Sequence, residues 1–287
     1  MSKIDYSTLC PQPKKVEPGT KQIEIVSLGC GVQSSTMVLM AAAGQIKPMP
    51  DAAIFADVGW EPDEVYQYLE YLKPRLPFPI YVVSNGNIRE DMLAASKGQT
   101  RSANPPFYTK AVSGKGEALL RRKCTEFYKI RPLVSKIREL LGFKKGERVK
   151  KARAISWIGI STDEMTRMKE SQIAWNDHRW PLIEKGMSRQ GCLDWMEQNG
   201  HPPPPRSACI GCPYHHNKVW REMKNNQPHY FEDAVDFDKG IREGFGGSQS
   251  QCFVHRSLQP LDEVDFRNDV DFGQMTMLDE CEGMCGN

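Results

Sequence analysis

The chain has 287 residues, a formal net charge of +2 and an apolar share of 39%. This length suffices for one large α/β domain with additions, or for two modest domains. The charged share of 26%, the mean hydropathy of -0.54 and the lack of any run near the ~20 apolar residues of a spanning helix argue against a membrane protein. The first 20 residues show no signal-peptide pattern, so we expect a soluble, cytoplasmic protein.

The nine cysteines are unevenly distributed. Cys209 and Cys212 form a C-x-x-C pair, Cys281 and Cys285 lie close together near the end, and Cys124 follows a run of basic residues. Without a secretory signal, the cysteines are expected to be reduced thiols rather than a disulfide framework. Their grouping suggests metal or redox chemistry.

Strand and helix patterns alternate from the start of the chain. Apolar, β-branched runs predict buried parallel strands, and each is followed by a helical pattern. These strands are expected at 23–28, 52–56 and 79–84. Such alternation predicts an α/β fold, a doubly wound parallel sheet covered by helices on both faces. Right-handed crossovers place the loops after the strands on one rim, where ligands of such sheets bind.

The later elements are predicted in the same way. Residues 97–116 are rich in Gly, Ser, Pro and Lys, which indicates a mobile loop, and a helix is expected through 127–141. A fourth strand is predicted at 154–160, a possible fifth at 180–184, and a helix from Ser188 to Gly200. The expected organisation is a lead-in at 1–20, a nucleotide-binding α/β domain at 21–200 and a cysteine-rich extension at 201–287.

The segment SLGCGVQSST, residues 27–36, directly follows the first predicted strand and opens a helix. Gly29 and Gly31 allow a tight turn and close approach of the backbone to a ligand, and free N–H groups of the following helical turn favour a phosphate. Ser34, Ser35 and Thr36 can add hydroxyl donors, and Ser27 is also expected to bind the nucleotide. The segment lacks the G-K-[ST] ending of a Walker loop and the G-x-G-x-x-G spacing of a dinucleotide site. An ordinary strand-to-helix turn is the alternative.

This segment resembles the PP-loop of the adenine nucleotide α-hydrolase-like superfamily, normally S-G-G-x-D-S. It is most similar to the variant in phosphoadenosine phosphosulfate (PAPS) reductases and their relatives. Further similar stretches follow in order, and together they span residues 23–216. They are FADVGWEPDEVYQYLEYL, RKCTEFYKIRPL, GISTDEMTRM and WPLIEKGMSRQGCLDWMEQNG.

The resemblance implies a PP-loop fold and an adenine nucleotide, either ATP or PAPS, with Mg²⁺ as a possible companion. Gln33 stands where ATP-consuming members usually carry Asp, which is similar to the reductase form. Asp57, at the end of the second strand, could meet a ribose, an adenine amine or a metal ion. A helix-capping or solvated Asp is the alternative.

Three charged residues follow the fourth predicted strand. Asp163 and Glu164 could orient the substrate as catalytic carboxylates, and Arg167 could clamp a phosphate or sulfate with two hydrogen bonds. A surface turn with an internal ion pair is the competing interpretation.

Thiolates spaced as Cys209 and Cys212 can share one metal ion or one cluster, and a redox dithiol is also open. Soft ligands alone do not separate zinc from iron–sulfur. Zinc could be completed by Cys124 with His215 or His216. The resemblance favours an iron–sulfur cluster of the 4Fe–4S type, because Cys124 and the C-x-x-C pair fall where cluster-binding members carry ligands. The adjacent cysteine pair of the reductases is reduced here to Cys124.

The tail DECEGMCGN resembles the mobile C-terminal Glu-Cys-Gly segment of PAPS reductases, whose thiolate attacks the sulfonucleotide. Cys281 or Cys285 could be that nucleophile, or could supply a fourth cluster ligand.

Two enzymatic interpretations and one non-enzymatic interpretation remain. The first is ATP-dependent adenylylation followed by sulfur transfer from a sulfur donor, to a nucleic acid or a small molecule. The basic stretches 121–123 and 143–153 would suit a nucleic-acid partner. The second is reduction of a sulfonucleotide to sulfite, with an external reductant. The third is a non-catalytic nucleotide-binding module.

Overall fold

The computed structural model describes residues 5–11, 14, 17–100, 105–113, 116–245 and 250–266. Its main element is a parallel five-stranded sheet with the order β3-β2-β1-β6-β7. The strands are β1 (Lys21–Leu28), β2 (Ala52–Asp57), β3 (Ile80–Ser84), β6 (Ala152–Trp157) and β7 (Asn176–Arg179).

The strand order reverses at β1. From β1 the chain adds β2 and β3 on one side, and it later returns to add β6 and β7 on the other. The carboxyl ends of β1 and β6 therefore form the topological switch point, where open α/β sheets bind ligands. The predicted phosphate loop follows β1, and a short 3₁₀ segment, η4 (Thr162–Arg167), follows β6.

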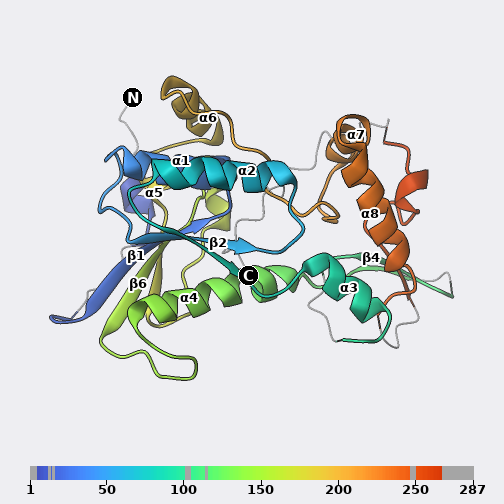
Figure 1. The fold of residues 1–287 in the computed structure, drawn as a ribbon, viewed down its shortest axis with the longest axis horizontal. Coiled ribbons are helices and arrows are strands. Elements are labelled where there is room, and N and C mark those ends of the chain that lie inside the picture. Colours follow the sequence, from blue (N-terminus) through green and yellow to red (C-terminus); the bar gives the residue numbers. More distant parts are fainter. Residues whose placement is uncertain are drawn as a thin grey trace.

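Helices cover both faces of the sheet, as expected for buried parallel strands. Figure 1 shows α1 and α2 above the sheet and α4 below it. One core contains side chains of α1, α2 and α6, and a second core contains those of α4. Because α1 is buried on all sides from Val32 to Ala41, its residues are apolar or small except for Gln33, whose side chain is hydrogen-bonded. The bounds are α1 (Val32–Ala42), α2 (Asp63–Leu72), α4 (Arg131–Leu141), α5 (Pro181–Glu184) and α6 (Arg189–Gln198).

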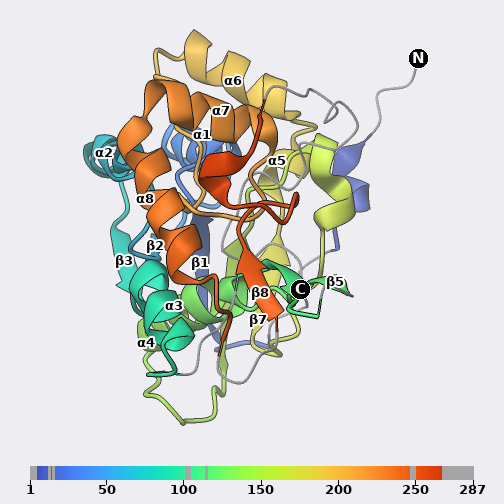
Figure 2. The same ribbon diagram turned by 90° about the vertical axis from the view of Figure 1, so that its right-hand side faces the viewer.

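A smaller antiparallel sheet lies beside this body, with the order β5-β4-β8. Figure 2 shows β8 and β5 below α7 and α8. Together with helix α3 they enclose a third core that draws on residues from 58 to 266. Segments on both sides of residue 200 share this core, and the division of the chain at 200 stays a prediction. The elements are β4 (Tyr108–Ala111), β5 (Glu117–Leu119), β8 (Ser250–Phe253), α3 (Ile88–Ser96), α7 (Asn217–Asn226) and α8 (Pro228–Gly240).

Shorter segments complete the described chain. They are the 3₁₀ turns η1 (Tyr6–Leu9), η2 (Lys73–Arg75) and η5 (Leu261–Glu263), and a π-helical segment η3 (Thr125–Ile130) that runs directly into α4. No helix within the described ranges has the length and apolar character needed to cross a bilayer.

Most predicted elements are confirmed, and two are wrong. The possible strand at 180–184 is the short helix α5, because Pro181 occupies its first turn, and the fifth strand lies just before it at Asn176–Arg179. The stretch 97–116 is not loop throughout, since Tyr108–Ala111 pairs with β5 and β8. The helix predicted from Ser188 is confirmed, with the Ser188 side chain accepting a hydrogen bond from the Gly191 N–H.

Candidate functional site

The turn between β1 and α1 is tight and largely buried. Cys30 has a left-handed backbone with φ 59°, and Gly31 caps the helix in an extended conformation. The Ser34 hydroxyl accepts a hydrogen bond of 3.2 Å from the Gly29 N–H, which closes the turn. The first N–H groups of α1 and the positive end of its dipole therefore lie at the switch point, as a phosphate site requires.

Two neighbouring hydroxyls of this loop differ in their bonding. Thr36 Oγ1 donates to the Val32 carbonyl at 2.8 Å, which is an ordinary intrahelical contact. Ser35 Oγ is buried and has no hydrogen-bond partner among the described residues. A buried hydroxyl without a partner costs free energy, so Ser35 is suited to bond a ligand oxygen.

Gln33 ties α1 to the segment after β6. Its Nε2 donates to Glu164 Oε2 at 3.1 Å, and its Oε1 accepts from Arg189 at 3.0 Å. Arg167 donates to the other oxygen of Glu164 at 2.5 Å. The four side chains form one network across the switch point, in which Gln33 and Glu164 are buried. The structure thus brings Gln33, Glu164 and Arg167 together as one unit beside the phosphate loop.

Asp57 and Asp163 both accept backbone hydrogen bonds. Asp57 Oδ1 accepts from the Gly59 N–H at 2.7 Å and from the Tyr66 hydroxyl at 2.8 Å. Asp163 Oδ2 accepts from the Arg189 N–H at 2.5 Å, at the start of α6. These contacts order the loops that carry the two carboxylates, and their roles toward a ligand stay predictions.

A cavity opens between the carboxyl ends of β1 and β2, with about 240 Å³ of space including its mouth. Ser27 and Gly29 of the phosphate loop line it, together with residues 54–56 of β2 and Ser207. We refer to it as the nucleotide cavity. The side chain of Lys129, from η3, forms part of its wall.

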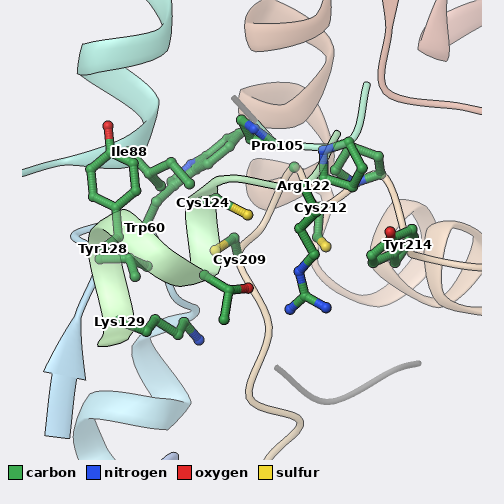
Figure 3. Close-up of a pocket in the computed structure, with 15 residues that line it drawn as sticks. Trp60, Ile88, Pro105, Arg122, Cys124, Tyr128, Lys129, Cys209, Cys212 and Tyr214 are labelled. Atoms are coloured by element: carbon green, nitrogen blue, oxygen red, sulfur yellow. The ribbon is translucent and has the colours of Figure 1, made fainter. Parts of the chain in front are cut away.

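A second cavity, the thiol pocket, brings the three predicted ligand cysteines together. Cys124, Cys209 and Cys212 all line it, although 85 residues separate the first two in sequence. Figure 3 shows their sulfur atoms facing the same space, with the charged ends of Arg122 and Lys129 below them. The pocket has about 490 Å³ of space including its mouth, and its other walls are mostly apolar.

Local geometry explains why the C-x-x-C segment forms a tight turn here. The Cys212 N–H donates to the Cys209 carbonyl at 3.1 Å, and the Ile210 N–H donates to the Trp60 carbonyl at 3.0 Å. Gly211 lies so close to the Trp60 indole that a β-carbon would stand 2.2 Å from a ring carbon. A glycine between the two cysteines is therefore a packing requirement.

Lys129 connects the two cavities, since it lines both. Its ammonium group lies 3.2 Å from Glu61 Oε1, and both side chains are buried. Burial raises the pKa of the Cys209 thiol, and the negative charge of Glu61 adds to this effect while Lys129 opposes it. The Lys129–Glu61 pair is thus close enough to change the pKa of the Cys209 thiol.

The histidines considered for zinc do not line the thiol pocket. His215 Nε2 contacts the Cys209 carbonyl oxygen at 3.0 Å, its ring packs edge-on against Trp220, and burial lowers its pKa to about 3. Within the described part of the chain, no group of three or more His, Cys, Asp or Glu is arranged to hold a metal ion. The predicted nucleophiles Cys281 and Cys285 lie outside the described residues.

Sequence reasoning missed Lys129, Glu61 and Arg189 as members of the site. A usable signal was present for all three, because each lies in a stretch quoted for its family resemblance. Lys129 also stands between Tyr128 and the apolar positions of α4, where a lysine is unusual. Buried lysines are nearly always paired, so a lysine at this position indicates an acidic partner.

The strand order, the phosphate loop at the switch point and the adjoining cavity define an α/β nucleotide-binding protein of the PP-loop type. A profile of the phosphoadenosine phosphosulfate reductase domain matches residues 23–185, more than half of the chain. The chain belongs to this family. As a member it is an enzyme, either a sulfonucleotide reductase or a related sulfurtransferase.

Among solved structures, the chain is similar to the phosphoadenylyl-sulfate (PAPS) reductase of Candida auris, crystallised as a phosphate complex. The identity is 11%, the TM-score is 0.39, and the match covers 66% of this chain and 76% of the other. A likeness at this score does not bear on function. No curated protein matches the chain.

Proposed function

We propose that this enzyme uses an adenine nucleotide bound at the phosphate loop to transfer sulfur at the thiol pocket. The observation that carries the proposal is the position of Lys129, whose side chain lines both the nucleotide cavity and the thiol pocket. A nucleotide in the first cavity and a sulfur centre in the second would share one wall. The reacting groups would then be held close together, which is a large part of what an enzyme contributes to a two-substrate reaction.

The nucleotide would be held mainly by the loop itself. Backbone N–H groups at the start of α1 and the Ser35 hydroxyl would bond phosphate oxygens, and the positive helix end would favour their charge. Arg189 and Arg167 are held beside the loop by Gln33 and Glu164, so they would add positive charge near the phosphates. If Mg²⁺ accompanies ATP, it would need carboxylate oxygens. Asp57 at the end of β2 and Glu164 in η4, after β6, are the predicted donors.

The thiol pocket fits an iron–sulfur cluster in its donor chemistry. Cys124, Cys209 and Cys212 supply three soft ligands around one largely apolar space. When bound, a cluster with one iron free of protein thiolate would supply a position to hold sulfur.

In the sulfur-transfer scheme, an oxygen of the acceptor attacks the α-phosphorus of ATP, and pyrophosphate leaves. A sulfur nucleophile, provided by a sulfur donor, then displaces AMP from the activated acceptor. In this scheme the chain's part is to bind the phosphates, exclude water and keep Lys129 near the transferring group.

Reduction of PAPS or its 3′-unphosphorylated form is the second candidate, and Gln33 favours it. The phosphate loop offers no carboxylate of its own at this position, and the Gln33 amide is hydrogen-bonded to Glu164 and Arg189. A thiolate of Cys281 or Cys285 would attack the sulfonucleotide sulfur, the S–O bond would break and the nucleotide would leave. Thiols of an external reductant would then release sulfite.

The cluster is tested by anaerobic purification followed by iron and sulfide analysis and an absorption spectrum. Broad absorption near ~400 nm with bound iron is expected. The variants Cys124→Ser, Cys209→Ser and Cys212→Ser should each lose iron, whereas Cys192→Ser, at a buried position in α6, should keep it. Normal iron content in any of the three pocket variants would contradict the proposed ligand set.

The two reactions are separated by their products. The purified protein is incubated with ATP or with PAPS, and AMP, pyrophosphate and sulfite are measured. Release of AMP and pyrophosphate that depends on a sulfur donor supports transfer, and release of sulfite that depends on a thiol reductant supports reduction. Failure to bind either nucleotide would contradict both.

A further inference from the structure

A large open groove runs along α4, on the face of the sheet opposite α1 and α2. It has about 2020 Å³ of space including its open side, and it is the most voluminous of the cavities described here. Its walls come from the end of β3, from η3 and α4, and from the loop after α4. We refer to it as the α4 groove. Nothing in the proposed nucleotide and thiol chemistry uses it.

Positive charge dominates the lining of the α4 groove. Five cationic side chains face two carboxylates, an excess of three. Glu126 pairs with Arg131 at 2.6 Å, and Glu139 pairs with Lys136 at 2.6 Å, so both carboxylates are already engaged. Lys144 and Lys145, both exposed, carry charge into the loop that follows, which adds three more exposed cations and one exposed carboxylate, Glu147. The cationic residues of the groove and loop are Arg131, Lys136, Arg138, Lys144, Lys145, Arg148, Lys150 and Lys151.

Aromatic rings alternate with these charges. Phe127 and Phe143 line the groove before and after α4, and both are half-buried. Three cations of the groove lie over aromatic rings, at 5.5 Å for Arg131 on Phe127, 4.3 Å for Lys136 on Tyr81 and 5.9 Å for Arg138 on Trp175. Tyr81 and Trp175 lie beside the groove, and its own rings are Phe127 and Phe143. A positive groove with interleaved aromatic faces is the arrangement that binds a single-stranded nucleic acid, because the phosphates meet cations while the bases stack.

The size and position of the groove fit the same partner. From Phe127 to Phe143 the helical segment extends roughly 24 Å, which is room for several nucleotides. One end also lies next to the proposed chemistry. The Phe127 ring packs edge-on against Tyr128 at 4.9 Å, and the Tyr128 side chain lines the thiol pocket. A strand along α4 would therefore end near the thiols.

We propose that the α4 groove binds a single-stranded nucleic acid, with Lys144 and Lys145 on its phosphates and Phe127 and Phe143 against its bases. The role of that strand as sulfur acceptor rests on the proposed function, but its binding does not. An acidic protein segment would pair with the cations but would not need the aromatic rings. A duplex would offer no exposed bases to stack.

The test is fluorescence anisotropy with labelled single strands of about 12 nucleotides and mixed sequence, one DNA and one RNA, at about 50 to 200 mM salt, a range in which counterion release changes affinity strongly. Binding that weakens steeply with salt is expected. Lys144→Glu/Lys145→Glu should weaken it at least about tenfold and lower the salt slope by about 2, one per lost phosphate contact. The two strands show whether the 2′-hydroxyl matters.

The control is Lys47→Glu/Lys73→Glu, which makes the same charge change at exposed positions after α1 and α2, on the other face of the sheet. It should bind like the wild type. Phe143→Leu keeps an apolar side chain but removes the stacking face, so affinity should fall about tenfold with an unchanged salt slope.

Equal binding by both lysine double variants would overturn the proposal, as would preference for a duplex or displacement of the strand by polyglutamate at equal charge. ATP and PAPS binding is measured on the same preparations by calorimetry. Loss of nucleotide binding with intact strand binding would count against the proposed function alone, and the reverse would count against the α4 groove alone.

Discussion

The ammonium group of Lys129 lies 3.2 Å from a carboxylate oxygen of Glu61, and the two side chains are only 7% and 1% exposed. The second oxygen of Glu61 has no hydrogen-bond partner within the described residues. This pair is therefore a buried charge pair that is only partly satisfied, at the wall shared by the nucleotide cavity and the thiol pocket. Such pairs contribute little net stability, but removing one member leaves the other charge buried and alone.

Lys129→Met is thus expected to lower the free energy of unfolding by about 3 kcal/mol or more, because it leaves the Glu61 carboxylate buried without its cationic partner. The double variant Lys129→Met/Glu61→Gln should recover most of this loss, because no net charge is left in the wall. Urea unfolding of the wild type, both single variants and the double variant gives the coupling. Additive losses in the double variant would contradict a direct interaction between the two side chains.

The Ser35 hydroxyl predicts opposite effects on folding and on binding. Since Ser35 Oγ is buried without a partner in the described structure, Ser35→Ala should leave stability unchanged or raise it slightly. The same change should weaken nucleotide binding by about 1.5–3 kcal/mol, the range for a hydrogen bond to a charged group. Thermal unfolding and calorimetry measure the two quantities. Thr36→Ser, which keeps the bond to the Val32 carbonyl, should leave nucleotide binding unchanged, while the loss of its buried methyl group should cost about 1 kcal/mol of stability.

Gly211 offers a steric test of the thiol pocket. An added β-carbon would stand 2.2 Å from the Trp60 ring, which is fixed by Phe237 at 4.4 Å and by a 2.6 Å hydrogen bond to Asp233. Gly211→Ala should therefore cost about 1–3 kcal/mol and displace the turn that holds Cys209 and Cys212. Both the melting temperature and the iron content should fall.

Gly191→Ala is the matched control for this change. Gly191 lies in the first turn of α6, and its nearest neighbour would be Ser188 Oγ at 3.4 Å, an ordinary contact. Since alanine favours helix over glycine by up to about 1 kcal/mol, this variant should be neutral or stabilised. A melting temperature for Gly211→Ala equal to that of the control would show that the Trp60 ring can move away at little cost in stability.

Periodicity and turn chemistry are enough to predict the main sheet. β1 and β2 are buried along most of their length, so their sequences are nearly continuous apolar runs, whereas the edge strand β3 is only partly buried. Glycines or a capping serine mark where helices begin or end. The error at 180–184 has the opposite cause. WPLIE is apolar enough for a strand, but Pro181 fits the first turn of a helix and cannot donate to a sheet.

The members of the site were harder to predict than the fold. The three pocket cysteines could be grouped by residue type and by family resemblance, and the structure places all three around one cavity. The pairing of Lys129 with Glu61 depends on how η3 crosses the end of β2, which no local pattern encodes. The network of Gln33 with Arg189 likewise joins residues 156 positions apart.

His255 predicts how stability depends on pH. Burial lowers its pKa to about 4. Two contacts suit the neutral ring, since Nδ1 accepts from the Ser257 N–H at 3.2 Å and Nε2 contacts Asn217 Oδ1 at 3.0 Å. The unfolded chain would take up a proton near pH 6.5, whereas the folded chain resists until about pH 4. Between these values the unfolded state binds more protons, so stability falls as the pH falls.

The stability that His255 contributes at neutral pH, up to about 3 kcal/mol, should therefore be lost between pH 6.5 and 4. His178 and His215 add to this trend, because burial lowers their pKa values as well. Urea unfolding at about pH 7.5 and about pH 5.5, roughly one unit either side of the unfolded value of histidine, measures the loss. His255→Gln should reduce the difference between the two pH values, whereas His229→Gln, at an exposed position, should not. An unchanged pH difference in His255→Gln would mean that the buried imidazole does not control this transition.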